Sequence, residues 1–137
     1  MKILITSIIS VFLFTSCNFT TNTVSETNKT QLSLRAIQTR DLEITDQNKL
    51  LRAIIATLQD LDFILTRVDK DLGVITANKA NKHSLDMTVT ASQKTNTQSA
   101  VRASARYKKR AIEDMKFYQD FFINLEKSLF LSSNNIS

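Results

Sequence analysis

The fold of this chain is decided by the stretch 85–108, which reads LDMTVTASQKTNTQSAVRASARYK. Apolar and polar residues alternate along both of its halves, and a period of two places one set of side chains on each face of a β-strand. The polar segment 93–98 between the halves predicts a turn. The stretch therefore predicts two half-buried strands, the second with a basic outer face. Their core positions are Leu85, Met87, Val89, Ala91, Val101, Ala103, Ala105 and Tyr107.

Residues 46–60, upstream of this stretch, predict an amphipathic helix. Thr45 or Asp46 offers an N-cap, and apolar side chains then recur at three- and four-residue steps. This spacing gives one continuous apolar stripe for burial. The stripe consists of Leu50, Leu51, Ile54, Ile55, Leu58 and Leu61.

Three further strands are predicted upstream of residue 85. The segments 63–68 and 74–77 form a hairpin, because the turn 69–73 between them contains Gly73, which supplies a positive φ. The segment 32–44 alternates less cleanly and is interpreted as the first strand.

A second helix is predicted downstream, with Asp114 as its cap. Its apolar side chains again repeat at three- and four-residue steps, and phenylalanines dominate them. We interpret this stripe as core, and the alternative is a groove that docks a partner. The stripe is formed by Met115, Tyr118, Phe121, Phe122, Leu125 and Leu129, and Phe117 and Phe130 of the same helix are also expected in the core.

The predicted fold class is α+β, in the order β-α-β-β-β-β-α. An antiparallel sheet of about four to five strands with two helices on one face buries the apolar positions of such a pattern. The alternative is a homodimer whose sheets join edge to edge across the first or last strand. A chain of 137 residues suffices for one such domain.

The composition excludes several classes of function. The net charge of +5 is a mild excess that falls short of the basic surface of a dedicated nucleic-acid binder. One cysteine and one histidine exclude an intrachain disulfide and the Cys/His metal frameworks, and a single glycine excludes the glycine-rich phosphate loops. No metal and no cofactor are expected.

The first 16 residues have the pattern of an export signal. Lys2 precedes an apolar run over 3–14, which is too short to span a membrane and is followed by the polar stretch 18–23. We therefore expect a signal peptide at 1–16. The remaining domain organisation is a flexible tether at 17–31, a single domain at 32–131 and a polar tail at 132–137.

The end of the apolar run, Leu13-Phe14-Thr15-Ser16-Cys17, resembles the lipobox of bacterial lipoproteins. The resemblance implies that Cys17 receives a diacylglyceryl group and becomes the first residue of the mature chain. Phe14 departs from the leucine usual at its position. The alternatives are an ordinary signal peptide with a chance cysteine, or a buried core cysteine. Asn18 after the cysteine favours the outer membrane over the inner one, by resemblance to lipoprotein sorting in two-membrane bacteria.

Several motifs lie along residues 35–131. They are Ile37-Gln38-Thr39-Arg40, Thr45-Asp46, Leu58-Gln59-Asp60-Leu61, the segment 71–79 (DLGVITANK), the segment 117–125 (FYQDFFINL) and Ser128-Leu129-Phe130-Leu131. Together they resemble an uncharacterised family of bacterial lipoproteins with a "QTR" strand, an "LQDLGF" helix end, a "DLGLITASK" strand and a closing "YQEFF…LFL" helix. Asp62 stands where that family often has glycine, and the middle around 80–112 is shorter. The resemblance implies no activity.

Two candidate chemical sites are weak. Asp69-x-Asp71-x-Gly73 superficially resembles a calcium loop, but Ala80 stands where the closing bidentate carboxylate belongs, so a solvated turn is predicted. His83 lies in a predicted polar turn, and the sequence has no nucleophile-elbow motif. The catalytic acid, base and nucleophile of a hydrolase are not visible, and no enzymatic activity is expected.

A basic group is the most suggestive charge feature. On an exposed face it would contact lipid headgroups, an anionic envelope polymer or an acidic partner. The alternative is a solvated face that keeps an outer strand from aggregating. Nucleic acid is not an expected partner, because an export signal removes the domain from the cytosol. The group comprises Arg102, Arg106, Lys108, Lys109 and Arg110.

These observations predict a lipoprotein of the cell envelope, anchored through lipid on Cys17 to a membrane and facing the periplasm or the exterior. Its expected role is that of a non-enzymatic interaction or accessory module of an envelope assembly. The alternative is a carrier of a small ligand or lipid, which requires an apolar pocket of several hundred Å³.

Overall fold

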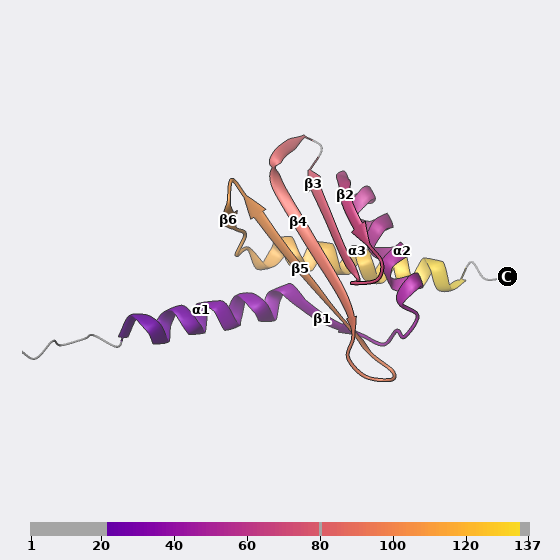
Figure 1. Cartoon of the computed structure of the whole chain (residues 1–137), viewed down its shortest axis with the longest axis horizontal. Helices are drawn as coiled ribbons and strands as arrows, with labels where there is room; N and C mark the ends of the chain where they lie inside the picture. Colours follow the sequence, from indigo (N-terminus) through magenta and orange to yellow (C-terminus); the bar gives the residue numbers. More distant parts are fainter. Residues whose placement is uncertain (1–21, 80, 135–137) are drawn as a thin grey trace, which may run out of the picture.

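A computed structural model describes residues 22–79 and 81–134 (Figure 1). The predicted signal peptide and Cys17 lie outside the described residues, as does the end of the predicted tail at 135–137. The described chain has the α+β class that the sequence predicts. Its elements are α1 (Asn22–Gln38), β1 (Thr39–Leu42), α2 (Gln47–Asp60), β2 (Phe63–Asp69), β3 (Val74–Lys79), β4 (Lys82–Gln93), β5 (Ser99–Tyr107), β6 (Arg110–Ala111) and α3 (Met115–Asn134).

The strands form one antiparallel sheet in the spatial order β1-β5-β4-β3-β2, with β6 paired to β5. The strands from β2 to β5 follow one another as a meander, whereas the connection from β1 to β2 crosses the sheet through α2. Helices α2 and α3 pack against each other behind the sheet as it is seen in Figure 1. The predicted antiparallel sheet with two helices on one face is thus confirmed.

The core lies between this helix pair and the sheet. The stretch 85–108 contributes as predicted, because Leu85, Met87, Val89, Ala91, Val101, Ala103 and Ala105 are all buried. Tyr107, the last apolar position of the pattern, is 43 % exposed because it lies at the end of β5. Each fully buried large apolar side chain stabilises the fold by about 1.5–3 kcal/mol.

Helix α2 begins where its cap predicts. The side chain of Asp46 accepts a hydrogen bond from the backbone N–H of Lys49 (2.9 Å). The apolar stripe of α2 then faces the sheet and α3, and Leu50, Ile54 and Leu58 are fully buried. A local cap and a clean period of 3.6 residues therefore suffice to determine this helix.

The N-terminal part of the domain differs from the prediction. Residues 32–38 belong to the helix α1 rather than to a strand, and 22–31, placed in a flexible tether by the sequence, are helical as well. The last turns of α1 pack on the domain, because Leu34 and Ile37 are partly buried against the core and Gln38 is buried. The strand β1 is confined to Thr39–Leu42.

The C-terminal helix corrects two further expectations. It extends to Asn134, so residues 132–134 are helical rather than part of a polar tail. Most of its predicted apolar stripe is core, because Tyr118, Phe121, Phe122 and Leu125 are buried and Phe117 and Leu129 are partly buried against them. Met115 and Phe130, which the sequence assigned to the core, are 53 % and 66 % exposed because they lie near the two ends of the helix.

The turn between β2 and β3 requires its glycine. Gly73 has φ +65°, as the sequence predicts, and a Cβ on it would lie 2.2 Å from the carbonyl oxygen of Ala91. The backbone N–H of Ala91 donates a hydrogen bond to the carbonyl of Gly73 (2.8 Å), which holds the two backbones together. The turn is thereby fixed against the end of β4.

Candidate functional site

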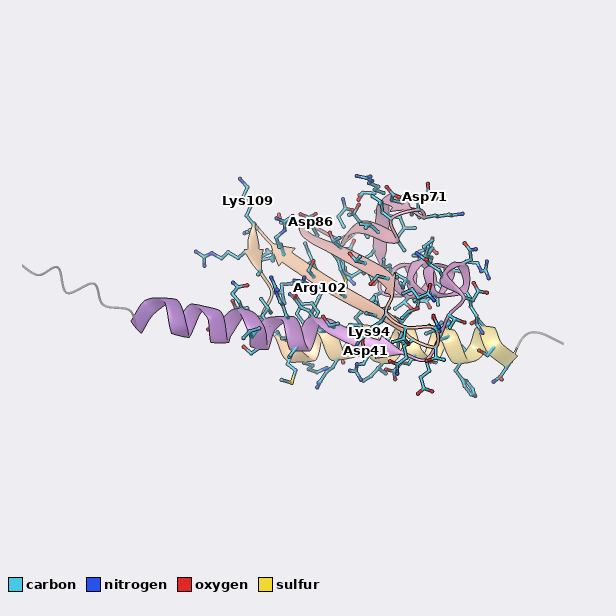
Figure 2. The ribbon with its side chains drawn as sticks, turned by 60° about the horizontal axis from the view of Figure 1, so that its bottom comes forward. Asp41, Asp71, Asp86, Lys94, Arg102 and Lys109 are labelled. Carbon is cyan, nitrogen blue, oxygen red and sulfur yellow. The ribbon has the colours of Figure 1, made fainter. Side chains whose placement is uncertain are left out.

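Four of the five predicted basic residues meet in one hairpin. Residues 106–110, with the sequence Arg-Tyr-Lys-Lys-Arg, join the end of β5 to β6, and we call them the basic hairpin. Tyr107 pairs with Arg110 across the hairpin, so its loop is only Lys108-Lys109. All five residues are exposed, and Figure 2 shows Lys109 at the outer end. The short strand β6 was not predicted, because two residues are too few to show alternation.

The fifth predicted residue, Arg102, lies apart from the hairpin, further along β5 (Figure 2). Its side chain is exposed, and its guanidinium donates a long hydrogen bond to the side-chain oxygen of Gln38 (3.4 Å). Arg102 therefore helps to join β5 to the end of α1 and does not extend the basic hairpin.

The loop of the basic hairpin has an unusual backbone. Lys108 and Lys109 have φ angles of 47° and 70°, and positive φ at both loop residues is the signature of a type I′ turn. Such turns prefer Asn-Gly, because a side chain with a Cβ costs about 1–2 kcal/mol in the left-handed region. This hairpin therefore presents two lysines at a cost in stability.

The charges of the basic hairpin are uncompensated within the described residues. None of its four cations forms an ion pair there, whereas Arg67, Lys94 and Lys116 each do. Among the described side chains, one contact with a hairpin cation is found, that of Lys108, whose ammonium lies 5.4 Å from the centre of the Tyr107 ring. The cations are consequently available to an external anion.

An open cleft of about 680 Å³ lies beside the basic hairpin. Tyr107 belongs to both features, and the remaining lining is largely apolar. Lys79 is the cation of the cleft, but its ammonium already donates to the carbonyl of Leu61 and lies 3.8 Å from the carboxylate of Asp62. The cleft is lined by Lys79, Asn81, Leu85, Tyr107, Ile112, Asp114 and Phe117.

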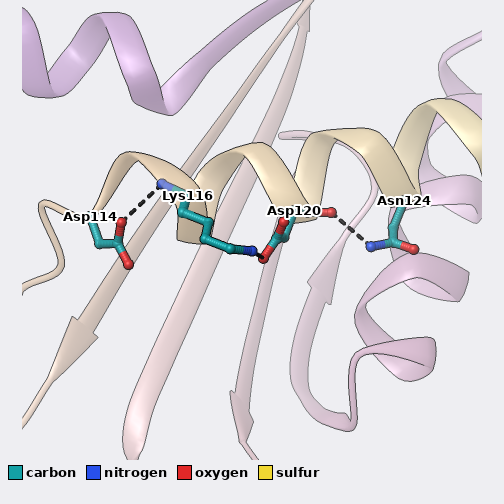
Figure 3. Close-up of polar contacts among 4 residues, drawn as sticks. All are labelled: Asp114, Lys116, Asp120 and Asn124. Atoms are coloured by element: carbon teal, nitrogen blue, oxygen red, sulfur yellow. Dashed lines mark hydrogen bonds and ion pairs between the residues drawn. The ribbon is translucent and has the colours of Figure 1, made fainter.

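The start of α3 contributes Asp114 and Phe117 to the cleft, and Figure 3 shows the polar contacts along the first turns of this helix. The carboxylate of Asp114 accepts a hydrogen bond from the backbone N–H of Lys116 (2.9 Å), which caps the helix as predicted. The ammonium of Lys116 donates to Asp120 (2.8 Å), and this bond raises the pKa of Lys116. The amide of Asn124 donates in turn to the backbone carbonyl of Asp120 (2.7 Å). These polar groups are used within the helix.

Beneath the hairpin, a buried tyrosine holds the elements together. The hydroxyl of Tyr118 donates to the carbonyl of Ile112 (2.7 Å) and accepts from the backbone N–H of Ala105 (3.2 Å) and the side-chain amide of Gln38 (3.1 Å). One oxygen thus ties α3 to β5, to the segment after β6 and to the end of α1. The sequence identified Tyr118 only as a core residue. Two of its three partners are backbone groups, and the third, the side chain of Gln38, lies 80 residues away along the chain.

The remaining candidates stay separate. Asp69 accepts hydrogen bonds from the backbone N–H of Leu72 (3.0 Å) and from Arg67 (2.8 Å), and these lower its pKa. This carboxylate is thus used to close the β2–β3 turn. The backbone of His83 belongs to β4 and not to a turn, because the strand begins at Lys82. Within residues 22–79 and 81–134, no three His, Cys, Asp or Glu side chains gather as a metal site would require.

Comparison with known proteins gives neither a matching family model nor a matching curated protein. The resemblance to an uncharacterised lipoprotein family therefore stays a prediction. Among the helices in the described part of the chain, none combines the length and the apolar character needed to cross a membrane.

Proposed function

We propose that this chain is an exported lipoprotein, held on a membrane by lipid attached to Cys17, and that its domain acts as a non-enzymatic interaction module of the cell envelope. The observation that carries the proposal is the position of Cys17, which is the single cysteine of the chain and directly follows the apolar run and two small residues. Two or three acyl chains hold a protein far more firmly than one, because each buried methylene contributes about 0.8 kcal/mol.

The described domain is compatible with this role. Its core extends from Leu34 to Leu129 and needs no disulfide, which suits a chain whose single thiol is committed to a lipid. The helix α1 leads away from the sheet toward the N-terminus (Figure 1), so an anchor at Cys17 leaves the domain surface accessible. An exposed cluster of cations that form no ion pair with the described residues is chemistry for binding anions rather than for moving protons between reacting groups.

Intact-mass measurement and membrane fractionation of the full chain, produced in a bacterial host, test the anchor. We expect a mature protein that begins at Cys17, carries the mass of a lipid and sediments with membranes. Cys17→Ser abolishes both properties, whereas Ser16→Ala, which keeps a small residue before the cysteine, leaves them unchanged. Recovery of the full-length chain from the cytosol with an unmodified thiol refutes the proposal.

Crosslinking in the native cell tests the interaction role. We expect one defined set of envelope proteins to be recovered with the wild-type chain. A protein that crosslinks to no partner under these conditions contradicts the proposal that it is an interaction module.

The cleft of about 680 Å³ favours one alternative function, the carriage of a small apolar ligand. Its volume lies in the range of small-molecule sites, and its walls include Leu85, Ile112 and Phe117. Titration with a dansyl-labelled fatty acid tests this alternative. Saturable binding of one probe per chain supports it, and a linear, unsaturable signal eliminates it.

A further inference from the structure

We propose that the basic hairpin rests on the anionic phospholipid headgroups of the membrane that carries the anchor, so that the domain turns one defined end toward the bilayer. This inference rests on the proposed anchoring at Cys17, and it adds the orientation of the domain and the chemistry of its contact surface.

The charge of the hairpin suits such a surface. Residues 106–110 hold four cations in five positions, all exposed and none in an ion pair within the described residues. The nearest carboxylates along the chain are Glu113 and Asp114, and Asp114 is engaged in capping α3. Asp86 lies opposite Arg106 in the strand register, without forming an ion pair with it. Four cations against these three carboxylates leave the projecting tip itself positive.

The placement of the hairpin relative to the N-terminus supports a membrane as its partner. Residues of α1, among them Leu34 and Ile37, line a common hollow with Glu113, in the segment between β6 and α3, and with Met115 at the start of α3. The preceding part of α1 continues beyond this contact, and in Figures 1 and 2 it projects from the same end of the molecule as the basic hairpin. The hairpin therefore belongs to the end of the domain from which the chain leads back to Cys17.

The length of chain between Cys17 and the contact of α1 limits how far this end can lie from the anchor. The eight residues 22–29 of α1 span about 12 Å as a helix. The five peptide steps from Cys17 to Asn22 cover at most about 18 Å in any conformation. Together they leave Thr30, which lines the hollow with Glu113 and Met115, within about 30 Å of the anchored residue, and a tilt of the helix reduces the height of this end above the membrane.

The apolar neighbours of the hairpin also suit a lipid interface better than a solvated tip. Tyr107 is 43 % exposed between two cations, and Met115 and Leu32 at the same end are 53 % and 67 % exposed. A tyrosine flanked by basic side chains matches the boundary between headgroups and acyl chains, where its ring is buried and its hydroxyl stays hydrated.

The backbone of the loop adds an independent argument. Lys108 and Lys109 occupy the two positive-φ positions of a type I′ turn, where Asn-Gly is the stable choice. The hairpin thus carries two long charged side chains at positions where any Cβ is strained, which is expected when the exposed tip has a binding role.

Sedimentation with lipid vesicles tests the proposal on the chain 18–137, which retains every residue packed into the core. The neutral vesicles are pure phosphatidylcholine, and the anionic vesicles are phosphatidylcholine to which about 30 mol % phosphatidylglycerol is added. We expect binding to the anionic vesicles only, weakening as salt is raised. Each cation at the contact should be worth about fivefold in the partition coefficient.

Two variants with equal loss of charge separate a defined contact from general attraction. Lys108→Gln, Lys109→Gln and Arg110→Gln together should lower the partition coefficient on the order of a hundredfold. The matched control removes three exposed cations elsewhere, with Arg52→Gln, Lys70→Gln and Lys127→Gln. This control should change the partition coefficient by less than about fivefold, because salt screens the attraction between the membrane and charges that lie more than a Debye length from it. Equal losses in the two variants, or no binding by the wild-type chain, overturn the proposal.

A third variant excludes loss of the fold as an explanation. Lys108→Asn with Lys109→Gly supplies the residues that the turn prefers, so this variant should be at least as stable as wild type and still bind about 25-fold more weakly. Unchanged binding by this variant contradicts the proposal.

The partner is identified with a photo-crosslinker at position 109 of the full chain in cells. Lipid adducts support the proposal, and adducts to an acidic protein overturn it in favour of a protein partner. The vesicle assay does not involve Cys17, so its failure leaves the proposed lipidation intact, and an unmodified thiol in the full chain leaves the vesicle result intact.

Discussion

Replacing Tyr118 by phenylalanine removes a single oxygen atom from the centre of the fold. That oxygen makes three hydrogen bonds, to the carbonyl of Ile112 and to the N–H groups of Ala105 and Gln38. The tyrosine is completely buried, so water cannot take the place of the hydroxyl without entering the core. The substitution therefore leaves up to three polar groups without a partner.

The expected cost follows from these bonds. A buried intramolecular hydrogen bond contributes about 1 kcal/mol net, and an unsatisfied buried partner costs about 1–3 kcal/mol. Rearrangement of the Gln38 side chain relieves part of this, so we expect Tyr118→Phe to lower the free energy of unfolding by about 3 kcal/mol. A domain of this size has only about 5–15 kcal/mol in total.

Urea unfolding of the chain 18–137, followed by circular dichroism, measures the effect. At an m-value of about 1.5 kcal/mol/M, the midpoint should fall by about 2 M. Tyr107→Phe is the matched control, because Tyr107 is 43 % exposed, and it should change the free energy of unfolding by less than about 0.5 kcal/mol. Similar losses for the two tyrosines would refute the reasoning that the hydroxyl of Tyr118 joins the elements.

Three further substitutions test local features. Gly73→Ala should lower the free energy of unfolding by more than about 2 kcal/mol, because its Cβ would meet the carbonyl of Ala91 at a positive φ; a loss below about 0.5 kcal/mol in urea contradicts this. Asp114→Ala should cost about 1 kcal/mol as a lost helix cap, and Asp114→Asn much less, by the same assay. Asp69 should titrate below its ordinary value of 3.8 in a carbon-13 NMR experiment, because the N–H of Leu72 stabilises its charge. Its contribution to stability is then present above that ordinary value and lost as the pH falls through the lowered pKa, and Asp69→Asn should remove this pH dependence.

The parts of the fold that could be predicted are those in which burial follows a local period. In β4 and β5, every second residue meets the helices, so Met87, Val89 and Val101 are buried as the alternation predicts. The helix α2 combines such a period with its own cap at Asp46. In these elements local preference and tertiary packing agree.

The helix α1 could not be predicted in the same way. A helix with a buried face normally shows an apolar stripe over several turns, whereas the described side chains of α1 that pack against the core, Leu34 and Ile37, both lie near its end. The buried amide of Gln38 is held by Tyr118, 80 residues away, a contact that no local pattern reveals. The alternation of residues 32–44 was therefore misinterpreted as a strand.

The candidate site likewise has a part that the local sequence predicts and a part that only the tertiary structure decides. The sequence identified the cations at positions 102–110, but the sheet register decides that four of them form the hairpin and that Arg102 does not. The exposure of Tyr107 also follows from its place at the end of β5 rather than from the alternation, which assigned it to the core. Only tertiary structure relates these groups to α1.

In the two-residue loop of the basic hairpin, the residues that carry positive charge are not the residues that would make the turn most stable. An Asn-Gly loop would relieve the positive φ angles of Lys108 and Lys109, and stability alone would favour that change. Solvation alone does not explain two lysines there either, since one cation beside the β6 edge already discourages pairing between sheets. A contact that gains affinity from each cation accounts for both residues, and it accounts for the absence of compensating ion pairs among the described neighbours. If the anchor at Cys17 restricts the domain to a membrane surface, even a modest gain per cation suffices to orient it, because the hairpin does not have to supply the attachment itself.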